Sequence, residues 1–246
     1  MTQPTQENSL ARESKPAAQR ISHSLLDPWL TGPLKGLYRR LDIPASFPPE
    51  GIVLTGHILA IFGAIGFALS GSHWWGGLLA ALGVAGNHIC DVLDGTHARA
   101  TGQCRNGGEL LDHFVDPLSF SYWTAGLAYC SGEPWFAAAG ITVIYAMAVL
   151  TSIKAKMVGQ FTLAHFGPTE FKTLLILFGI HQASSLVTSS GSKAGLAEAA
   201  MNRAWWFLLV LVVAGIIQLK ISLWMAIKEV NSEDAEQPDT TEWEVR

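Results

Sequence analysis

The sequence predicts an all-α integral membrane protein with six transmembrane helices and an N-terminal amphipathic interfacial segment. Its composition is the first reason: of 246 residues, 49 % are apolar and only 15 % are charged, and the mean hydropathy is +0.28. Soluble domains carry nearer a quarter charged residues. The second reason is that the charged residues gather toward the two ends, leaving long apolar stretches between them.

Six stretches are long and apolar enough to cross a bilayer, which takes about 20 helical residues. The last stretch is the most apolar, whereas the fifth is weakened by His181 and Gln182. The predicted spans are 52–70, 74–93, 113–131, 134–153, 171–189 and 204–227.

The connections between these spans differ in charge. Lysine or arginine precedes the first span and occurs in the connections 94–112 and 154–172, whereas 71–73 and 131–134 contain neither. The connection before the sixth span departs from this pattern with one lysine and one arginine. Because positively charged loops stay in the cytoplasm, we expect both termini and the connection 94–112 on the cytoplasmic side.

The chain divides into four parts. Residues 1–22 and the acidic residues 229–246 are expected to be disordered tails. In 23–50, apolar side chains alternate with basic ones and prolines interrupt the pattern, which predicts short amphipathic pieces at the membrane interface rather than one uniform helix. An ordinary linker is the alternative for that part. Residues 51–228 form the membrane domain.

Four carboxylates and three small residues occupy two helical faces where the second and third spans meet. Residues at i, i+3, i+4 and i+7 share one face of a helix, as do residues at successive steps of four. A short connection makes the two helices antiparallel neighbours, so the carboxylates should converge near the membrane surface. The first face carries Asp91, Asp94, Gly95 and Ala98, and the second carries Gly108, Asp112 and Asp116.

Such a group of carboxylates requires counter-charge, because ionised side chains at a bilayer are costly and like charges repel. Oxygen ligands favour hard divalent cations, so we expect Mg²⁺ or Mn²⁺ as cofactor, bound as two ions. The guanidinium of Arg99 suits phosphate oxygens. Metal ions beside a carboxylate that deprotonates a hydroxyl indicate phosphoryl transfer.

The residues 91–116 form the pattern Asp-x2-Asp-Gly-x2-Ala-Arg-x8-Gly-x3-Asp-x3-Asp. This pattern resembles the signature of the CDP-alcohol phosphatidyltransferases, and every fixed position is matched. The resemblance implies a six-helix membrane enzyme of phospholipid synthesis, usually a homodimer, with a polar cavity open to the cytoplasm. It also implies that an acceptor hydroxyl attacks the β-phosphate of a CDP-alcohol and that CMP leaves. One of the two substrates would be a lipid, and the pattern leaves their identity open.

The resemblance further implies roles for single residues. The metal ligands would be Asp91, Asp94, Asp112 and Asp116, and Asp116 would also act as the general base. CDP would contact Gly95, Ala98, Arg99, Gly108 and, near the start of the first span, Thr55. Candidates for contact with the acceptor or headgroup are Lys154, Lys156, Glu170 and Lys172. Each candidate also has a structural explanation, either as a positive residue near lipid headgroups or as part of a helix cap.

Two other classes of function compete with this enzyme. An ion- or proton-coupled transporter could use the same carboxylates, but it should carry polar groups along a full path across the bilayer. A catalytically silent family member would be expected to lack a motif aspartate, and none is missing. The net charge of −4 argues against nucleic acid as a partner.

Overall fold

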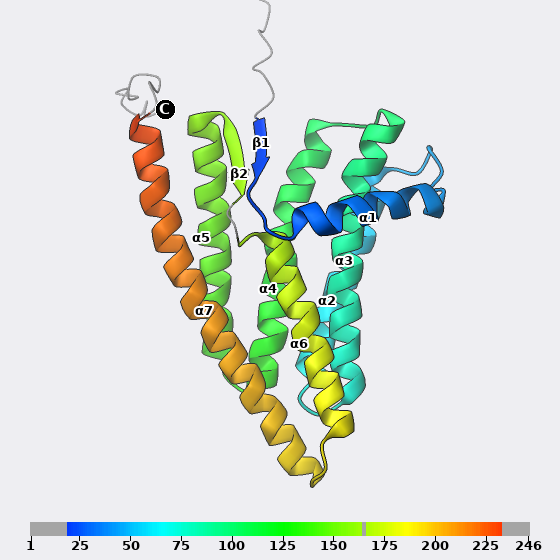
Figure 1. The fold of residues 1–246 in the computed structure, drawn as a ribbon, viewed down its shortest axis with the longest axis vertical. Helices are drawn as coiled ribbons and strands as arrows, with labels where there is room; N and C mark the ends of the chain where they lie inside the picture. The colour runs from blue at the N-terminus through cyan, green and yellow to red at the C-terminus, as the bar shows by residue number, and fades with distance from the viewer. Residues whose placement is uncertain (1–18, 164–165, 233–246) are drawn as a thin grey trace, which may run out of the picture.

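The computed structural model of the chain describes residues 19–163 and 166–232. Six long helices run up and down beside one another, and a shorter helix lies across one end of this bundle (Figure 1). The long helices are α2 (Pro49–Leu69), α3 (Trp74–Thr101), α4 (Asn106–Ser131), α5 (Pro134–Val158), α6 (Pro168–Thr188) and α7 (Lys193–Ser232). Each predicted span lies within one of them or overruns its end by a single residue, so the all-helical fold class is confirmed.

Five of the described helices are long and apolar enough to cross a membrane, namely α2, α3, α5, α6 and α7. The helix that contains the third predicted span, α4, is not among them. Its first half carries Glu109, Asp112 and Asp116, which lower its mean hydropathy. That all six helices cross the membrane therefore stays a prediction. It rests on the alternating direction of the six helices (Figure 1).

Glycine and proline set the ends of several helices. A proline stands in the first turn of α2, α5 and α6, where its missing N–H has no helical partner to lose. Three helices stop at a glycine in the left-handed conformation, which other residues rarely adopt. These are Gly102 after α3, Gly132 after α4 and Gly159 after α5.

The helix across the end of the bundle, α1 (Asp27–Leu41), differs from the short pieces that were expected. It runs as one helix through Pro33 and ends at Asp42, whose φ is 45°. A proline at this position removes one backbone hydrogen bond, and the helix continues because contacts at both of its ends hold it, as described below. None of its residues is buried, and Trp29 is 77 % exposed. The position of this segment at the membrane interface stays a prediction.

Two short strands were not predicted. β1 (Gln19–Ser22) pairs in parallel with β2 (Gln160–Leu163), in the register Gln19↔Gln160. The sequence analysis expected no structure before residue 23, whereas the pairing fastens the chain ahead of α1 to the connection between α5 and α6. At the other end of the chain, α7 continues to Ser232, beyond the expected limit of the membrane domain.

The core lies among α2, α3, α4, α6 and the first half of α7. Trp123 is fully buried there, and its indole N–H donates to the carbonyl of Ala60 at 2.9 Å. The helices α2 and α3 approach closely at two glycines, since a Cβ on Gly83 would lie 2.5 Å from the Cα of Gly63. Small residues allow such contacts between membrane helices.

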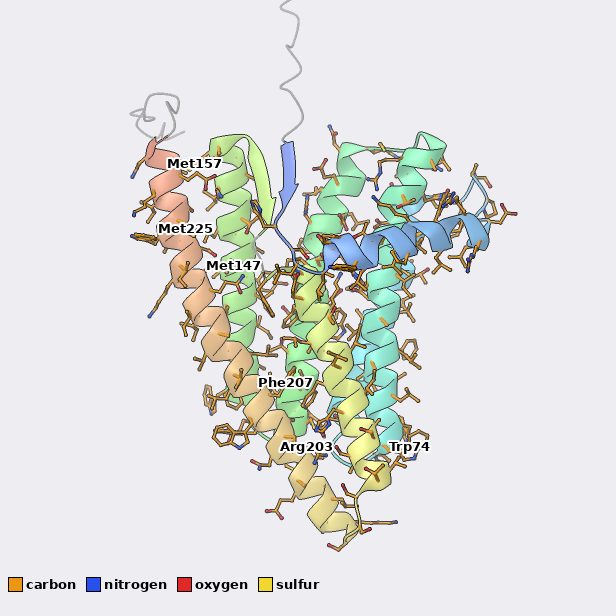
Figure 2. The ribbon with its side chains drawn as sticks, viewed as in Figure 1. Trp74, Met147, Met157, Arg203, Phe207 and Met225 are labelled. Carbon is orange, nitrogen blue, oxygen red and sulfur yellow. The ribbon has the colours of Figure 1, made fainter. Side chains whose placement is uncertain are left out.

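At the end of the bundle opposite α1, side-chain hydrogen bonds link α6 to α7. Figure 2 shows Arg203 and Trp74 at this end, where α6 turns into α7. The Arg203 guanidinium donates to Gln182 at 2.8 Å, and the Gln182 amide donates to the carbonyl of Ala200 at 2.9 Å. The buried Gln182 is thus satisfied, and both of its partners belong to α7.

Candidate active site

The four aspartates of the motif line one cavity between α2, α3 and α4. Asp91 and Asp94 lie in the last third of α3, and Asp112 and Asp116 lie in the first half of α4. The third wall is α2, where Gly56 permits the approach, because a Cβ there would lie 2.8 Å from the Cβ of Cys90.

A lysine from α6 joins two of these carboxylates. The Lys172 ammonium donates to Asp91 Oδ2 at 2.8 Å and to Asp116 Oδ1 at 3.0 Å. The lysine side chain has no exposed surface, whereas the two aspartate side chains are 25 % and 26 % exposed. Lys172 therefore approaches from the protein side, and the carboxylates border the cavity.

Asn87 is a polar residue of the cavity wall that the sequence analysis did not select. Its amide donates to the carbonyl of Gly56 at 3.1 Å, and its buried Oδ1 accepts no hydrogen bond from any described group. Asn87 stands four residues before Asp91, one helical turn earlier on the same face. That spacing was a signal in the sequence that could have identified it.

The residues expected to contact CDP lie outside the lining of this cavity. Arg99 places its guanidinium over Gly95, since a Cβ there would lie 3.2 Å from Nη1. Around Gly108 the space is open, with no atom within 4 Å of a Cβ. Ala98 is half-buried on α3 beside this region. Thr55 is exposed on α2, and its hydroxyl donates to the carbonyl of Gly51 at 2.8 Å.

Three of the four acceptor candidates have partners within the protein. Lys154 pairs with Glu229 of α7 at 2.7 Å, and Lys172 pairs with the motif aspartates. Glu170 is only 6 % exposed. Its Oε1 accepts hydrogen bonds from Ser24 and from the backbone N–H groups of residues 25 and 26, and its Oε2 accepts one from residue 167. The fourth candidate, Lys156, is exposed near the end of α5.

The donor set of the cavity fits a hard divalent cation, because all four side chains offer carboxylate oxygens. Within the described residues, no three His, Cys, Asp or Glu side chains have the spacing of a preformed metal site. Asp91 and Asp116 are held by the Lys172 ammonium instead, and the Asp94 carboxylate accepts from the backbone N–H of Gly95. Metal binding would thus require small movements of these side chains.

Comparison with known proteins gives the context of this cavity. A sequence model of the family described as CDP-alcohol phosphatidyltransferase matches residues 51–191, more than half of the chain. The chain belongs to the CDP-alcohol phosphatidyltransferase family. All four motif aspartates and Lys172 lie within the matched range. Membership of this membrane family, together with the apolar helices, makes the chain an integral multi-pass membrane protein.

Part of the chain is similar in sequence to the phosphatidylinositol phosphate synthase of Mycolicibacterium smegmatis, strain ATCC 700084 / mc(2)155. The two proteins are 28 % identical over 116 residues, which is 46 % of this chain and 50 % of the relative. The chain thus spans about half the length of the curated relative that it matches.

Proposed function

We propose that the protein transfers a substituted phosphate group from a CDP-alcohol to an acceptor hydroxyl with the help of divalent metal ions, releasing CMP. The observation that carries this proposal is the single cavity lined by all four motif aspartates in a member of the CDP-alcohol phosphatidyltransferase family. The proposal places the protein in phospholipid synthesis, with one of its two substrates a lipid.

In the proposed mechanism, the metal ligands would be Asp91, Asp94, Asp112 and Asp116, and the Mg²⁺ or Mn²⁺ that they hold would neutralise phosphate charge. Asp116 removes the proton from the acceptor hydroxyl as this oxygen attacks the β-phosphate. The bond between that phosphate and CMP then breaks, and CMP leaves with the electron pair.

The proposed CDP site consists of five residues on α2, α3 and α4. The guanidinium of Arg99 over Gly95 presents N–H donors where phosphate oxygens would lie. The open space at Gly108 leaves room for the nucleotide to approach the backbone of α4. Ala98 and Thr55 complete the expected set on α3 and α2.

The donor and the acceptor are proposed only as classes. The name of the relative suggests a transfer that yields phosphatidylinositol phosphate, while the Thr169-Glu170 pair resembles an element of the choline and ethanolamine branch. Lys156 is the acceptor candidate with an exposed side chain. We propose in addition that the cavity opens to the cytoplasm, that both termini lie there, and that the protein is a homodimer.

The experiment is an assay of CMP release by the purified protein with Mg²⁺ or Mn²⁺. The panel pairs CDP-diacylglycerol with polyol phosphates, and CDP-choline and CDP-ethanolamine with diacylglycerol, and mass spectrometry identifies the lipid formed. We expect one pair to give CMP and a new phosphodiester. No CMP from any pair would count against the proposal, and ion flux in proteoliposomes would then favour the transporter.

The general base has its own test. Asp116→Asn should lower turnover by about 10²–10⁴-fold, the usual contribution of general-base catalysis, while gel filtration shows an intact fold. Asp42→Asn is the matched control, because Asp42 lies in the exposed turn after α1 and asparagine tolerates its left-handed conformation. An Asp116→Asn variant with most of its activity would show that another group accepts the proton.

A further inference from the structure

Lys172 comes from α6, which does not contribute to the lining of the carboxylate cavity. Its ammonium nevertheless bonds the two carboxylates that come from different helices, Asp91 of α3 and Asp116 of α4. The lysine is fully buried, and the ring of Phe120 lies 5.6 Å from its Nζ. A buried lysine is costly unless its charge is paired, so this contact is a fixed part of the site.

Each carboxylate uses one oxygen for the lysine. Asp91 presents Oδ2 and Asp116 presents Oδ1, and the two side chains keep about a quarter of their surface exposed while they line the cavity. Rotation of each carboxylate is restricted by this bond, while both residues remain part of the cavity lining. An outer partner that fixes a metal ligand in this way strengthens metal binding.

We propose that Lys172 is a positioning residue that orients Asp91 and Asp116 for divalent metal binding. It holds one oxygen of each carboxylate and sets the distance between α3 and α4 at the site. This inference rests on the proposed metal-dependent function, and it assigns to Lys172 a role inside the protein rather than contact with the acceptor.

The role differs from two others that the same lysine could have. As a competing counter-ion, Lys172 would occupy oxygens that a metal ion needs, and its removal would tighten metal binding. As a purely structural link between α6 and its neighbours, it would stabilise the protein equally with and without metal. Metal affinity therefore separates the three roles.

The test measures Mn²⁺ binding to the full-length protein in detergent by the loss of the free-ion EPR signal, without any substrate. Lys172→Met should weaken Mn²⁺ binding by about 10–100-fold, the usual effect of losing such an outer partner. Lys172→Arg keeps the positive charge and can donate to both carboxylates, so it should recover most of the Mn²⁺ affinity. The matched control is Lys228→Met, since the Lys228 ammonium lies 3.6 Å from the centre of the Trp224 ring on α7 and outside the cavity lining, and it should bind Mn²⁺ as the wild type does.

The outcomes separate this inference from the proposed function. A wild type that binds no Mn²⁺ would overturn both. If the wild type binds Mn²⁺ and the Lys172→Met variant binds it equally or more tightly, the positioning role alone would be overturned. If Lys172→Met fails to fold, Lys172→Gln replaces it, since glutamine keeps a donor without the charge. Should neither fold even with Mn²⁺, the lysine is a structural link and the inference is wrong.

Discussion

Glu170 fastens the chain before α1 to the start of α6, and its removal should release that segment. The carboxylate lies at the first turn of α6 and accepts hydrogen bonds from Ser24 Oγ at 2.6 Å and from the N–H groups of Leu25 at 2.8 Å and Leu26 at 3.1 Å. Its second oxygen accepts from the N–H of Gly167 at 2.8 Å. The substitution Glu170→Ala deletes all four bonds.

The size of the effect follows from these contacts. A hydrogen bond to a charged group contributes about 1.5–3 kcal/mol, so the gross loss is roughly 6–12 kcal/mol. Leu25 is largely exposed and Leu26 is half-buried, so their freed N–H groups regain water and recover much of that energy. A net loss of about 3 kcal/mol is therefore expected for attachment of the segment, which corresponds to a roughly hundredfold rise in local opening.

Hydrogen–deuterium exchange followed by mass spectrometry measures this opening. Amides of residues 24–27 should exchange roughly a hundredfold faster in Glu170→Ala, with little change in the peptides of α2 and α4. Glu229→Ala is the control, because this half-exposed carboxylate has an ion pair with Lys154, and such pairs contribute only about 0–1 kcal/mol. Unchanged exchange at 24–27 in Glu170→Ala would refute the reasoning.

Three further predictions concern the cofactor, the packing and the second attachment of α1. A chelator should stop CMP release and excess Mg²⁺ should restore it, and activity that survives chelation would contradict the metal proposal. Gly83→Val should lower the free energy of unfolding by about 3 kcal/mol, because the added atoms collide with the backbone of α2. Gly86→Ala, whose Cβ meets only a flexible leucine side chain, should cost much less, and thermal denaturation compares the two. Tyr38→Phe removes a 2.9 Å bond to His97 and should speed amide exchange in the C-terminal half of α1 by about fivefold, since such a bond contributes about 1 kcal/mol. Unchanged exchange would show that this bond does not hold α1.

Local patterns in the sequence were enough for the helices and for the carboxylate cavity. Apolar length predicted the six bundle helices, because a membrane helix satisfies its own backbone hydrogen bonds and needs no distant partner. The spacing of 91, 94, 112 and 116 placed the aspartates on two faces, and a short connection between α3 and α4 was enough to bring these faces together.

Features that depend on distant residues were missed. The strand β1 exists because it pairs with β2, and no local pattern in four residues reveals that partner. The same holds for His97, which is fully buried because its ring nitrogens meet the Tyr38 hydroxyl at 2.9 Å and the carbonyl of Phe47 at 2.8 Å. No local pattern in the sequence predicts the burial of His97, since its partners come from α1 and from the turn before α2.

The continuity of α1 through Pro33 has its explanation in these distant contacts. Isolated helices of this length are marginal in water, and an internal proline weakens them further. Here the first turn is held by Ser24 and by the hydroxyl of Thr169, which donates to Asp27 at 2.5 Å, and the last turns are held by Tyr38. With both ends fixed, the helix can lose one internal hydrogen bond and still persist.

The start of α6 connects α1 with the proposed chemistry. Within four residues, Thr169 and Glu170 bind the chain around the start of α1, and Lys172 binds Asp91 and Asp116. Because one rigid helical turn carries all three side chains, a shift of α1 would move the Lys172 ammonium relative to the carboxylates. If Lys172 orients those carboxylates, then Glu170→Ala should weaken Mn²⁺ binding as well, by less than Lys172→Met does. Equal Mn²⁺ affinity in Glu170→Ala and wild type, despite faster exchange at residues 24–27, would show that the two ends of this turn act independently.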